Sequence, residues 1–532
     1  MSTFKITSIK GVNSCMEKYD LCVIGGGPAG YAAAMRAIDF DKKVLLIEKE
    51  KLGGAGIYNG ALSSKTMWEL STRYRKVKQD LGKEKAVEID ISFDEVKNTI
   101  EEAIFDRKFQ LTSHLRIIHA ETNLITYEKG LASFISDKEI KITKSGEKDK
   151  IIYAEHIIIA SGSSPRKLPN VEVDEKIIMT SDGIHHLDKF PKSLVIVGAG
   201  VIGCEYATMF ANFGKTKVHI IDRAERILPF EDKDISDLIS KNMEKKGVVI
   251  HRKSQLKRIE IKNGMVEYEI ETIGGELEVI KVEKALLSIG RTPNISSLDI
   301  ENAGVLMSKR GVHIGDVDTQ TNVPHIFAVG DVSGRIPLVN VGEREARHAV
   351  VKMFADFPVK SINYDNVSTI MFLDPVVASV GESEQNLQKK NIPYRLAKVD
   401  YSTIARAISM GNPEGFFKLI VSDDSEMKVL GMRAAGVHAS SAIQSIALLM
   451  YMDKGIDELA HMIHPHPSIV EGVQEAARML LGKSIYKSAV FKDKLKCYKF
   501  RDGVVTPLNT IDDEKRIKFE EISRSLHESG ED

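Results

Sequence analysis

Two glycine-rich segments, each followed by a carboxylate, are the parts of this chain whose residue types and spacing indicate chemistry. The first reads Gly25-x-Gly27-x-x-Gly30, with Glu48 18 residues further on. In such a segment the first glycine permits a tight turn, the second lets the backbone approach a pyrophosphate, and the third lets a helix pack closely on a strand. The helix N-terminus offers N–H donors to phosphate, and the acid is placed to accept ribose hydroxyls. The segment predicts a dinucleotide site.

The second segment has the same parts: Gly198-x-Gly200-x-x-Gly203, with Asp222 19 residues after the third glycine. An acid at this position binds a free 2′-hydroxyl and repels a 2′-phosphate, which favours NAD over NADP. The adjacent Arg223 is able to hold a phosphate, so NADP remains the less favoured alternative. The chain therefore carries two predicted dinucleotide sites, one of them for NAD(H).

Short apolar strands and the helices that follow them must position both glycine segments. Strands alternating with helices at this spacing indicate βαβ units and parallel sheets. After residue 365 the pattern changes to short β-type runs followed by helices from about 440 to 480, which predicts a separate α+β domain. The fold class is α/β, with two Rossmann-like domains and a C-terminal α+β domain. The predicted strands of the two βαβ units are 19–24, 44–47, 193–197 and 218–222.

The composition is that of an ordinary globular protein. The 532 residues include 74 Lys+Arg and 75 Asp+Glu, a net charge of −1 that gives no field to attract nucleic acid. No apolar run reaches the roughly 18 residues of a membrane span. Four scattered cysteines exclude a disulfide framework, no metal site is expected, and the N-terminus lacks a secretory apolar region. We expect a cytoplasmic protein of about three domains, with an organelle presequence as the weaker alternative.

Over residues 18–485 the chain resembles the pyridine nucleotide–disulfide oxidoreductases, especially the dihydrolipoamide dehydrogenases and the soluble pyridine nucleotide transhydrogenases. The resemblance rests on seven motifs in the family's order. These motifs are Gly25–Gly30, Gly53-Gly54 through Ser64-Lys65, Ala160-Ser-Gly162, Gly198–Glu205, Ser288–Asn294, Thr321–Asp331, and His464-Pro-His-Pro467 with Glu471.

The resemblance implies that the first site holds FAD, the second holds NAD(H), and the C-terminal α+β domain forms a homodimer. The predicted parts are an N-terminal extension (1–18), an FAD-binding domain (19–165 and 290–360), an NAD-binding domain (166–289), a dimerisation domain (361–487) and a C-terminal extension (488–532). Partners other than a second copy and a small-molecule acceptor are not required, although the tail is a possible docking element for a protein.

The resemblance also assigns individual site residues. Asp331 would accept hydrogen bonds from the ribityl or pyrophosphate region, and Lys65 would pair with Glu205 beneath the flavin, near N5. A cation there stabilises the electron-rich reduced flavin. The implied FAD residues are Gly25, Gly27, Gly30, Glu48, Lys65, Ala132, Gly162 and Asp331. The implied NAD residues are Gly198, Gly200, Gly203, Glu205, Asp222 and Gly290.

One departure from the family changes the predicted chemistry. Disulfide reductases of the family carry a Cys-x4-Cys pair between the Gly-Gly and the Ser-Lys, and here Gly56 and Ala61 occupy those positions. This segment therefore offers no protein disulfide that could accept electrons from the flavin. The lost sulfurs either leave a space over the flavin that Tyr58 and Asn59 line, or the loop collapses inward.

The family's proton-transfer pair is present as His466 and Glu471, five residues apart. A carboxylate behind an imidazole fixes its tautomer and raises its basicity. In relatives this pair reaches the flavin of the neighbouring subunit, although a purely packing role for His466 is the alternative. Among the remaining thiols, Cys22 and Cys204 are expected to be inert and buried, whereas lysines near Cys497 would lower its pKa.

The sequence predicts a flavin-dependent NAD(P)H oxidoreductase that passes hydride from NADH through FAD directly to an acceptor without a protein disulfide. Candidate acceptors are a second pyridine nucleotide, a quinone or another small oxidant, of which transhydrogenation is the leading interpretation. One alternative is a catalytically impaired FAD-binding scaffold subunit. Another is a disulfide reductase relayed through Cys497.

Overall fold

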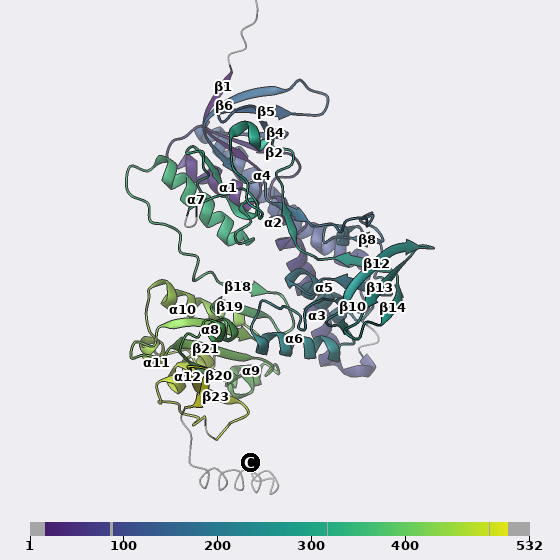
Figure 1. Cartoon of the computed structure of the whole chain (residues 1–532), viewed down its shortest axis with the longest axis vertical. Helices are drawn as coiled ribbons and strands as arrows, with labels where there is room; N and C mark the ends of the chain where they lie inside the picture. Colours follow the sequence, from purple (N-terminus) through teal and green to yellow (C-terminus); the bar gives the residue numbers. More distant parts are fainter. Residues whose placement is uncertain (1–15, 86–88, 316–317, 489, 509–532) are drawn as a thin grey trace, which may run out of the picture. The chain divides into compact units, whose positions relative to one another are not determined.

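The computed structural model describes residues 16–85, 89–315, 318–488 and 490–508. The chain divides into two compact units (Figure 1). The first contains residues up to 63, 101–165 and 291–362, and the second contains the remaining three segments, 64–100, 166–290 and 363 onward. The second unit thus combines the segment around Gly198 with the C-terminal α+β fold.

The first unit is built on a seven-stranded sheet. Its strands are β1 (Glu17–Ile24), β2 (Val44–Glu48), β3 (Ile125–Lys129), β4 (Leu131–Phe134), β5 (Glu139–Thr143), β6 (Lys150–Ile159) and β17 (Ile326–Ala328). The order is β3-β2-β1-β6-β5-β4, with β17 paired to β6. Strands β3, β2, β1, β6 and β17 run parallel to one another, whereas β4 and β5 pair antiparallel. The central strands β1, β2 and β6 contain buried apolar runs (Leu21–Ile24, Val44–Ile47 and Ile157–Ile159), because both faces of a parallel sheet are covered.

Helices α1 (Pro28–Ile38) and α7 (Val339–Phe354) pack side by side in this unit (Figure 1). Pro28 starts α1 favourably because its fixed φ suits the first helical turn and its missing N–H needs no partner there. Helix α2 (Gly54–Ile57) is a single turn. Helices α3 (Ala61–Lys85) and α4 (Phe93–Thr122) each cross the boundary between the two units. Shorter elements are β7 (Ser163–Pro165), β16 (Arg291–Pro293), η3 (Ile300–Ala303) and η4 (Gly330–Ser333).

The second unit repeats the parallel plan on a five-stranded sheet of order β11-β10-β9-β15-β8. Its elements are β8 (Ile178–Met179), η2 (Gly183–His186), β9 (Ser193–Val197), α5 (Val201–Phe213), β10 (Lys217–Ile221), α6 (Lys233–Lys245), β11 (Val249–His251) and β15 (Lys284–Leu287). An antiparallel meander of β12 (Gln255–Lys262), β13 (Met265–Glu271) and β14 (Leu277–Val282) covers it. Helix α5 ends at Gly214, whose positive φ of 66° forms a left-handed C-cap. The second predicted βαβ unit is present.

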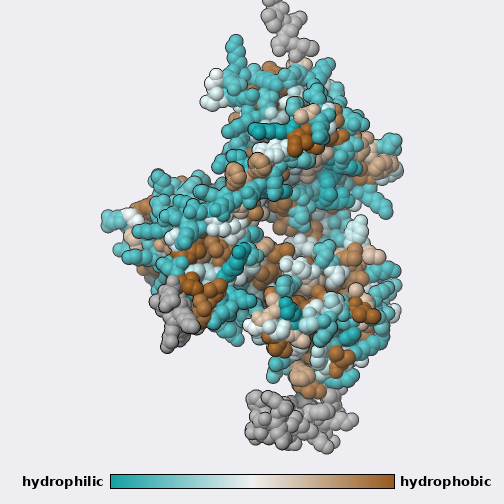
Figure 2. Space-filling model, turned by 180° about the vertical axis from the view of Figure 1, so that it is seen from behind, coloured by the Kyte–Doolittle hydropathy of each residue, from teal (hydrophilic) through white to brown (hydrophobic). Residues whose placement is uncertain are grey.

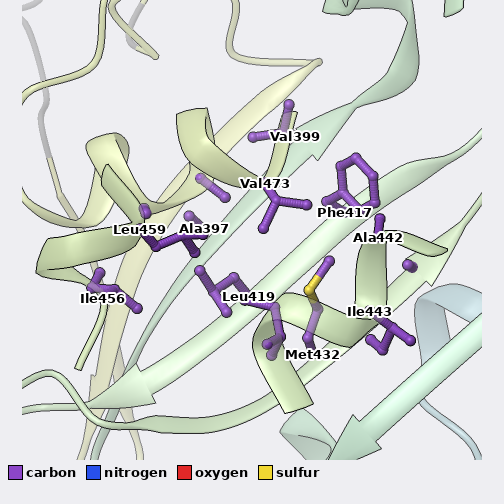
Figure 3. Packing of buried hydrophobic residues seen from close by; sticks show 14 of the residues in the cluster. Ala397, Val399, Phe417, Leu419, Met432, Ala442, Ile443, Ile456, Leu459 and Val473 are labelled. Atoms are coloured by element: carbon purple, nitrogen blue, oxygen red, sulfur yellow. The ribbon is translucent and has the colours of Figure 1, made fainter. Parts of the chain in front are cut away.

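The C-terminal part of this unit is an antiparallel seven-stranded sheet of order β18-β19-β22-β21-β20-β23-β24. Its core packs Val399, Phe417, Leu419 and Met432 of the sheet against helices (Figure 3). The strands are β18 (Thr369–Met371), β19 (Val377–Gly381), β20 (Tyr394–Asp400), β21 (Phe416–Ser422), β22 (Val429–Ala435), β23 (Leu495–Arg501) and β24 (Val504–Pro507). The helices are α8 (Glu384–Lys389), η5 (Tyr401–Thr403), α9 (Ala405–Ser409), α10 (Ala439–Tyr451), α11 (Asp457–His461) and α12 (Glu471–Leu480).

The C-terminal extension is partly a structural element of that domain. Strand β23 pairs antiparallel with β20, and β24 forms the sheet edge. Cys497 on β23 is only 7% exposed, belongs to the core cluster, and its Sγ lies 3.7 Å from the carbonyl oxygen of Met479. Burial raises the pKa of the Cys497 thiol to about 12. The expectation that neighbouring lysines lower this pKa is wrong, because strand pairing turns the thiol into the core.

Cys22 and Cys204 are fully buried, and burial raises the pKa of both thiols, as the sequence predicted. Cys15 lies outside the described residues, and so do Ile517, Phe519, Ile522 and Leu526, whose spacing predicts an amphipathic helix in the tail. Figure 2 shows a face covered mainly by hydrophilic residues, with hydrophobic ones in separate groups. Within the described ranges, no helix is both long and apolar enough to span a bilayer.

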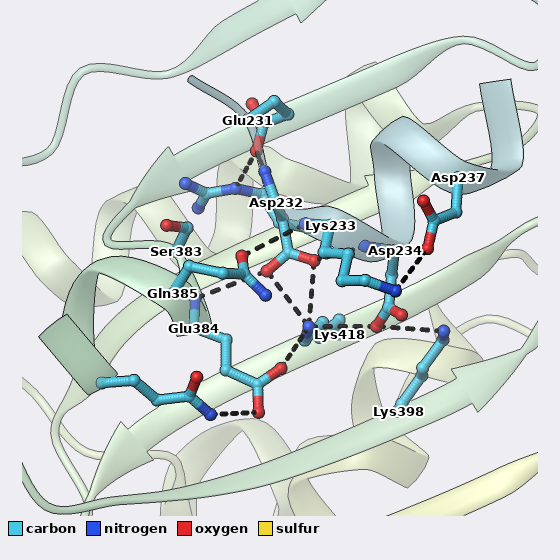
Figure 4. A network of polar contacts seen from close by, with 12 residues as sticks. Glu231, Asp232, Lys233, Asp234, Asp237, Ser383, Glu384, Gln385, Lys398 and Lys418 are labelled. Atoms are coloured by element: carbon cyan, nitrogen blue, oxygen red, sulfur yellow. Dashed lines mark hydrogen bonds and ion pairs between the residues drawn. The ribbon is translucent and has the colours of Figure 1, made fainter. Parts of the chain in front are cut away.

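A row of four cations crosses the antiparallel sheet at one level. Strand register aligns Lys496 with Lys398, Lys398 with Lys418, and Lys418 with Arg433. Cations that lie opposite one another on neighbouring strands destabilise a sheet unless nearby anions neutralise them. The segment Glu231-Asp232-Lys233-Asp234, at the start of α6, supplies anions to three of the four, Lys398, Lys418 and Arg433 (Figure 4).

Lys418 is the most buried member of the row, with 1% of its side chain exposed. Its ammonium lies 2.9 Å from Asp232, 3.0 Å from Asp234 and 2.5 Å from Glu384. Burial alone lowers the pKa of Lys418, but these carboxylates outweigh burial and raise it above its ordinary value. Because Asp232 also caps α6 by accepting from the Asp234 N–H at 3.0 Å, the same carboxylate starts the helix and neutralises the lysine.

We predict that Lys418→Met lowers the free energy of unfolding by about 3–5 kcal/mol, because it leaves buried carboxylates without their cation. Thermal or urea unfolding measures this loss. The control is Lys428→Met, which removes an exposed pair with Asp453 and is expected to change stability little. Equal stability of the two variants contradicts the prediction.

We also predict that the thiols of Cys22, Cys204 and Cys497 do not react with a thiol reagent in the native protein, because burial keeps them protonated and covered. The measurement uses a Cys15→Ser background and compares native with urea-denatured protein. Rapid native labelling of Cys497, located by peptide mass spectrometry, contradicts its position in the core.

Candidate functional site

The turn between β1 and α1 is shaped as a phosphate cradle. Gly25 has a φ of 112°, and a Cβ on Gly30 would collide with the Gly25 carbonyl, so side chains are excluded at both positions. A Cβ on Gly27 would instead meet nothing within 4 Å. Helix α1 has no side-chain cap, so its first N–H groups face this open space. The geometry agrees with the roles that the sequence predicts for the three glycines.

Glu48 closes this cradle at the end of β2. Its carboxylate accepts the Gly26 N–H and the Glu50 N–H, each at 2.7 Å. The side chain is buried, and both contacts fix its orientation beside the glycine turn. A ribose next to the pyrophosphate would meet this oriented acceptor.

A hollow of about 720 Å³ lies beyond Glu48, lined by Lys49, Tyr127 and Gly130 among other residues. Tyr58 belongs to the same neighbourhood: its ring lies 4.9 Å from the Lys51 ammonium, and burial together with the Glu48 carboxylate raises its pKa. Tyr58 therefore lies near Glu48, the acid that the sequence predicts to bind a ribose. Leu131 also lines this hollow, and the next residue of β4 is the buried Ala132.

The implied flavin-site acid, Asp331, lies in a network of its own. The Ser163 hydroxyl donates to Asp331 at 2.6 Å, and the Arg291 Nε–H donates to the Ser163 Oγ at 2.7 Å. The buried Glu345 on α7 accepts the Gly330 N–H at 2.7 Å and so holds the turn before Asp331. Gly162, with a φ of 68°, makes the turn that brings Ser163 there. Sequence reasoning missed Ser163, Arg291 and Glu345 as supporting residues, although Arg291 lies inside a quoted motif.

The second cradle has the same construction. Gly198 has a φ of 104°, Gly203 packs against its carbonyl, and a Cβ on Gly200 would meet nothing within 4 Å. The Asp222 carboxylate accepts the Ala199 N–H at 2.7 Å and the Ala224 N–H at 2.8 Å, in close parallel to Glu48. Helix α5 also lacks a side-chain cap.

The far wall of this cradle is the segment after β15. The Ser288 hydroxyl donates to the Gly198 carbonyl at 2.8 Å and so braces the glycine turn. Gly290 has a φ of 105° and open space at its Cβ position. Ser288 is a further supporting residue that the sequence analysis did not identify, although it begins the Ser-Ile-Gly-Arg motif.

Lys65 and Glu205 form the expected ion pair, with Lys65 Nζ 2.8 Å from Glu205 Oε2. Lys65 stands in the first turns of α3, and Glu205 is buried in α5. Glu205 Oε1 accepts the Phe372 N–H at 2.9 Å, so both carboxylate oxygens are used. A buried carboxylate whose oxygens are both hydrogen-bonded holds its partner cation in a fixed position.

The segment from Gly53 to Lys65 contains no cysteine. A Cβ on Gly56 would lie 2.5 Å from Cγ of Pro28, so the backbone at this position approaches α1 more closely than a larger side chain permits. Ala61 begins α3. The close approach of Gly56 to Pro28 favours the collapsed loop over an open space at this point.

His466 and Glu471 are in direct contact, with His466 Nδ1 2.8 Å from Glu471 Oε1. Glu471 Oε2 also accepts the Ser468 N–H at 2.8 Å. Burial raises the pKa of Glu471, but that N–H and the imidazole outweigh it and hold the pKa below its ordinary value. The His466 side chain is 71% exposed, beside the exposed Ile463. The imidazole thus has an orienting carboxylate and an open face.

The residues present fit two dinucleotides. Each cradle combines an uncapped helix, an open glycine position and a carboxylate held by two backbone N–H groups. Pyrophosphates and riboses need these donors and acceptors. Within the described part of the chain, no group of three or more His, Cys, Asp or Glu residues is arranged to hold a metal ion.

Comparisons with known proteins agree with this geometry. Residues 19–346 match the family model described as pyridine nucleotide-disulphide oxidoreductase, and residues 367–477 match its dimerisation domain. Strands β23 and β24 lie beyond the matched range. The chain is 31% identical over 479 residues to the mitochondrial dihydrolipoyl dehydrogenase of Pisum sativum, covering 88% of this chain and 93% of that protein.

A second relative is the dihydrolipoyl dehydrogenase of Geobacillus stearothermophilus, 32% identical over 466 residues with 87% and 96% coverage. Among solved structures, the HOCl-induced flavoprotein disulfide reductase of Escherichia coli matches with a TM-score of 0.76 at 26% identity, covering 87% of this chain and 100% of that chain. Members of this family depend on FAD and use pyridine nucleotides. With both family domains matched in order, the chain belongs to the pyridine nucleotide-disulphide oxidoreductase family and is a flavin-dependent oxidoreductase resembling dihydrolipoamide dehydrogenase.

Proposed function

We propose that this protein is an FAD-dependent NAD(P)H oxidoreductase that passes hydride from NADH through FAD directly to a small acceptor, without a protein disulfide. The observation that carries the proposal is a pair of dinucleotide cradles in a chain with no cysteine between Cys22 and Cys204. The buried Cys497 gives no support to a relay through the tail. A second pyridine nucleotide is the favoured acceptor, and quinones are the next class.

FAD, when bound, accepts a hydride from a reduced nicotinamide and returns two electrons to an acceptor. In the proposal Asp222 selects NAD by accepting from its ribose and repelling a 2′-phosphate. Lys65, held by Glu205, places a cation where negative charge develops near N5. His466, oriented by Glu471, donates the proton that accompanies hydride transfer to a quinone, whereas hydride transfer to a second nicotinamide needs no proton.

The proposed assembly is a homodimer in which His466 serves the flavin of the second subunit. The match of residues 367–477 to the family's dimerisation domain supports this assembly. The exposed imidazole of His466, next to exposed Met462 and Ile463, supports it further, since apolar side chains on a surface indicate a contact region.

We predict that anaerobic titration of the FAD-loaded protein with NADH bleaches the flavin absorbance at about one equivalent, whereas NADPH acts far more weakly. Without an adjacent thiolate, no long-wavelength charge-transfer band accompanies the bleaching. Turnover is then measured with a nicotinamide analogue, a soluble quinone and lipoamide, of which only the first two are expected to be reduced. Flavin that neither nucleotide reduces overturns the enzymatic proposal and favours a scaffold subunit.

We predict that His466→Gln slows turnover with a quinone by roughly 100-fold, in keeping with loss of a general acid–base, and leaves both flavin reduction by NADH and hydride transfer to a nicotinamide analogue unchanged. Stopped-flow and steady-state rates separate the two half-reactions. His461→Gln, an exposed histidine of the same segment, is the matched control. Equal rates for both variants would show that His466 has only a packing role.

A further inference from the structure

The Lys65 ammonium is held by more than the carboxylate of Glu205. The ring centroid of Phe372 lies 4.9 Å from Lys65 Nζ, within the range of a cation–π contact. The backbone N–H of the same Phe372 donates to Glu205. One residue therefore contacts both members of the ion pair, with its ring on the cation and its backbone on the anion.

Phe372 is itself fixed from the helix that carries Lys65. The Trp68 ring meets the Phe372 ring edge-on, with centroids 5.3 Å apart and an interplanar angle of 77°. The buried Trp68 also donates its Nε1–H to the Leu373 carbonyl at 3.1 Å. Because Trp68 follows Lys65 by one helical turn in α3, the ring and the ammonium are locked in one arrangement.

The three N–H groups of the Lys65 ammonium therefore have different surroundings. One donates to Glu205 at 2.8 Å and one to the Ser64 hydroxyl at 3.3 Å. Within the described residues the third has no acceptor, and the Phe372 ring covers one approach to it without competing as a strong acceptor. An aromatic face keeps an ammonium charged at a lower desolvation cost than an aliphatic side chain of similar size.

We propose that Phe372 is a positioning residue for hydride transfer: its ring and backbone together hold the charged Lys65 ammonium in the orientation that the flavin requires. This inference rests on the proposed function, because it concerns the same cation and its role near N5. The sequence motifs that indicate Lys65 and Glu205 do not include Phe372, since it lies 167 residues after Glu205.

The test compares Phe372→Leu with Phe372→Tyr, which keeps an aromatic face. The flavin's reduction equilibrium is measured against a reference dye with a chemical reductant, so this readout needs no nucleotide. In Phe372→Leu we expect the equilibrium constant for reduction and the rate of reduction by NADH to fall roughly 2- to 30-fold, with an unchanged KM for NADH. Phe372→Tyr restores both to within about twofold of the parent.

The control is Phe416→Leu, which removes another Lys–Phe contact, between Lys398 and Phe416 at 4.1 Å, inside the C-terminal domain. It is expected to leave the flavin equilibrium unchanged. Trp68 is the one tryptophan of the chain, so its emission in the flavin-free protein reports whether the local packing survives in each variant. A changed emission in Phe372→Leu with the parental equilibrium overturns the inference.

If Phe372→Leu does not fold, a phenylalanine trifluorinated on its ring at position 372 replaces it, because fluorine removes the negative ring face while keeping the shape. A parental equilibrium in that variant also overturns the inference. The two proposals fail differently: a wild-type flavin that NADH does not reduce overturns the proposed function, whereas equal dye equilibria for Leu and Tyr at position 372 overturn only the role of Phe372.

Discussion

The close approach of backbone to backbone at the two glycine turns is the constraint on which the candidate sites depend. At Gly30 and Gly203 a helix passes so near the preceding turn that a single Cβ would collide with a carbonyl oxygen. This approach aims the uncapped N-termini of α1 and α5 at the positions where Gly27 and Gly200 leave open space. It also brings the turn N–H groups within reach of Glu48 and Asp222. Without that contact, neither the phosphate donors nor the ribose acceptors are placed.

Buried charge is handled in two different ways in the second unit. Around Lys418 the sheet gathers cations in one row. Carboxylates at the start of α6, together with Glu384 of α8, pair with the buried Lys418 ammonium, so several partners compensate the cost of its burial. At Lys65 a single carboxylate is used, and both of its oxygens are occupied. The first arrangement joins the start of α6 to the C-terminal sheet. The second leaves one face of an ammonium to an aromatic ring, which agrees with the charged role that we propose for Lys65.

The segment from Gly53 to Lys65, in which the sequence resemblance places Gly56 and Ala61 at the family's redox-cysteine positions, packs closely on its surroundings. Gly56 lies against Pro28, and Tyr58 lies near Glu48. Asp331 nevertheless accepts from Ser163, and His466 is hydrogen-bonded to Glu471, as the proposed function requires. The proposal of direct transfer to an acceptor follows from this combination. Strand β23 shows that the C-terminal extension belongs to the sheet, so at least its first part is a structural addition.

Local pattern in the sequence determined the strand-glycine-helix units, the carboxylates Glu48 and Asp222 beside them and the fold class, because each depends on residues within about 30 positions of one another. It also indicated the pairs Lys65–Glu205 and His466–Glu471, through motifs. Tertiary structure alone decided the rest. Strand pairing buried Cys497 against a local signal of nearby lysines, and packing brought Phe372 onto Lys65 and Arg291 onto Ser163. The Phe372–Lys65 and Arg291–Ser163 contacts join residues 307 and 128 positions apart, where no spacing rule along the chain operates. At Cys497, burial rather than neighbouring charge sets the pKa of the thiol.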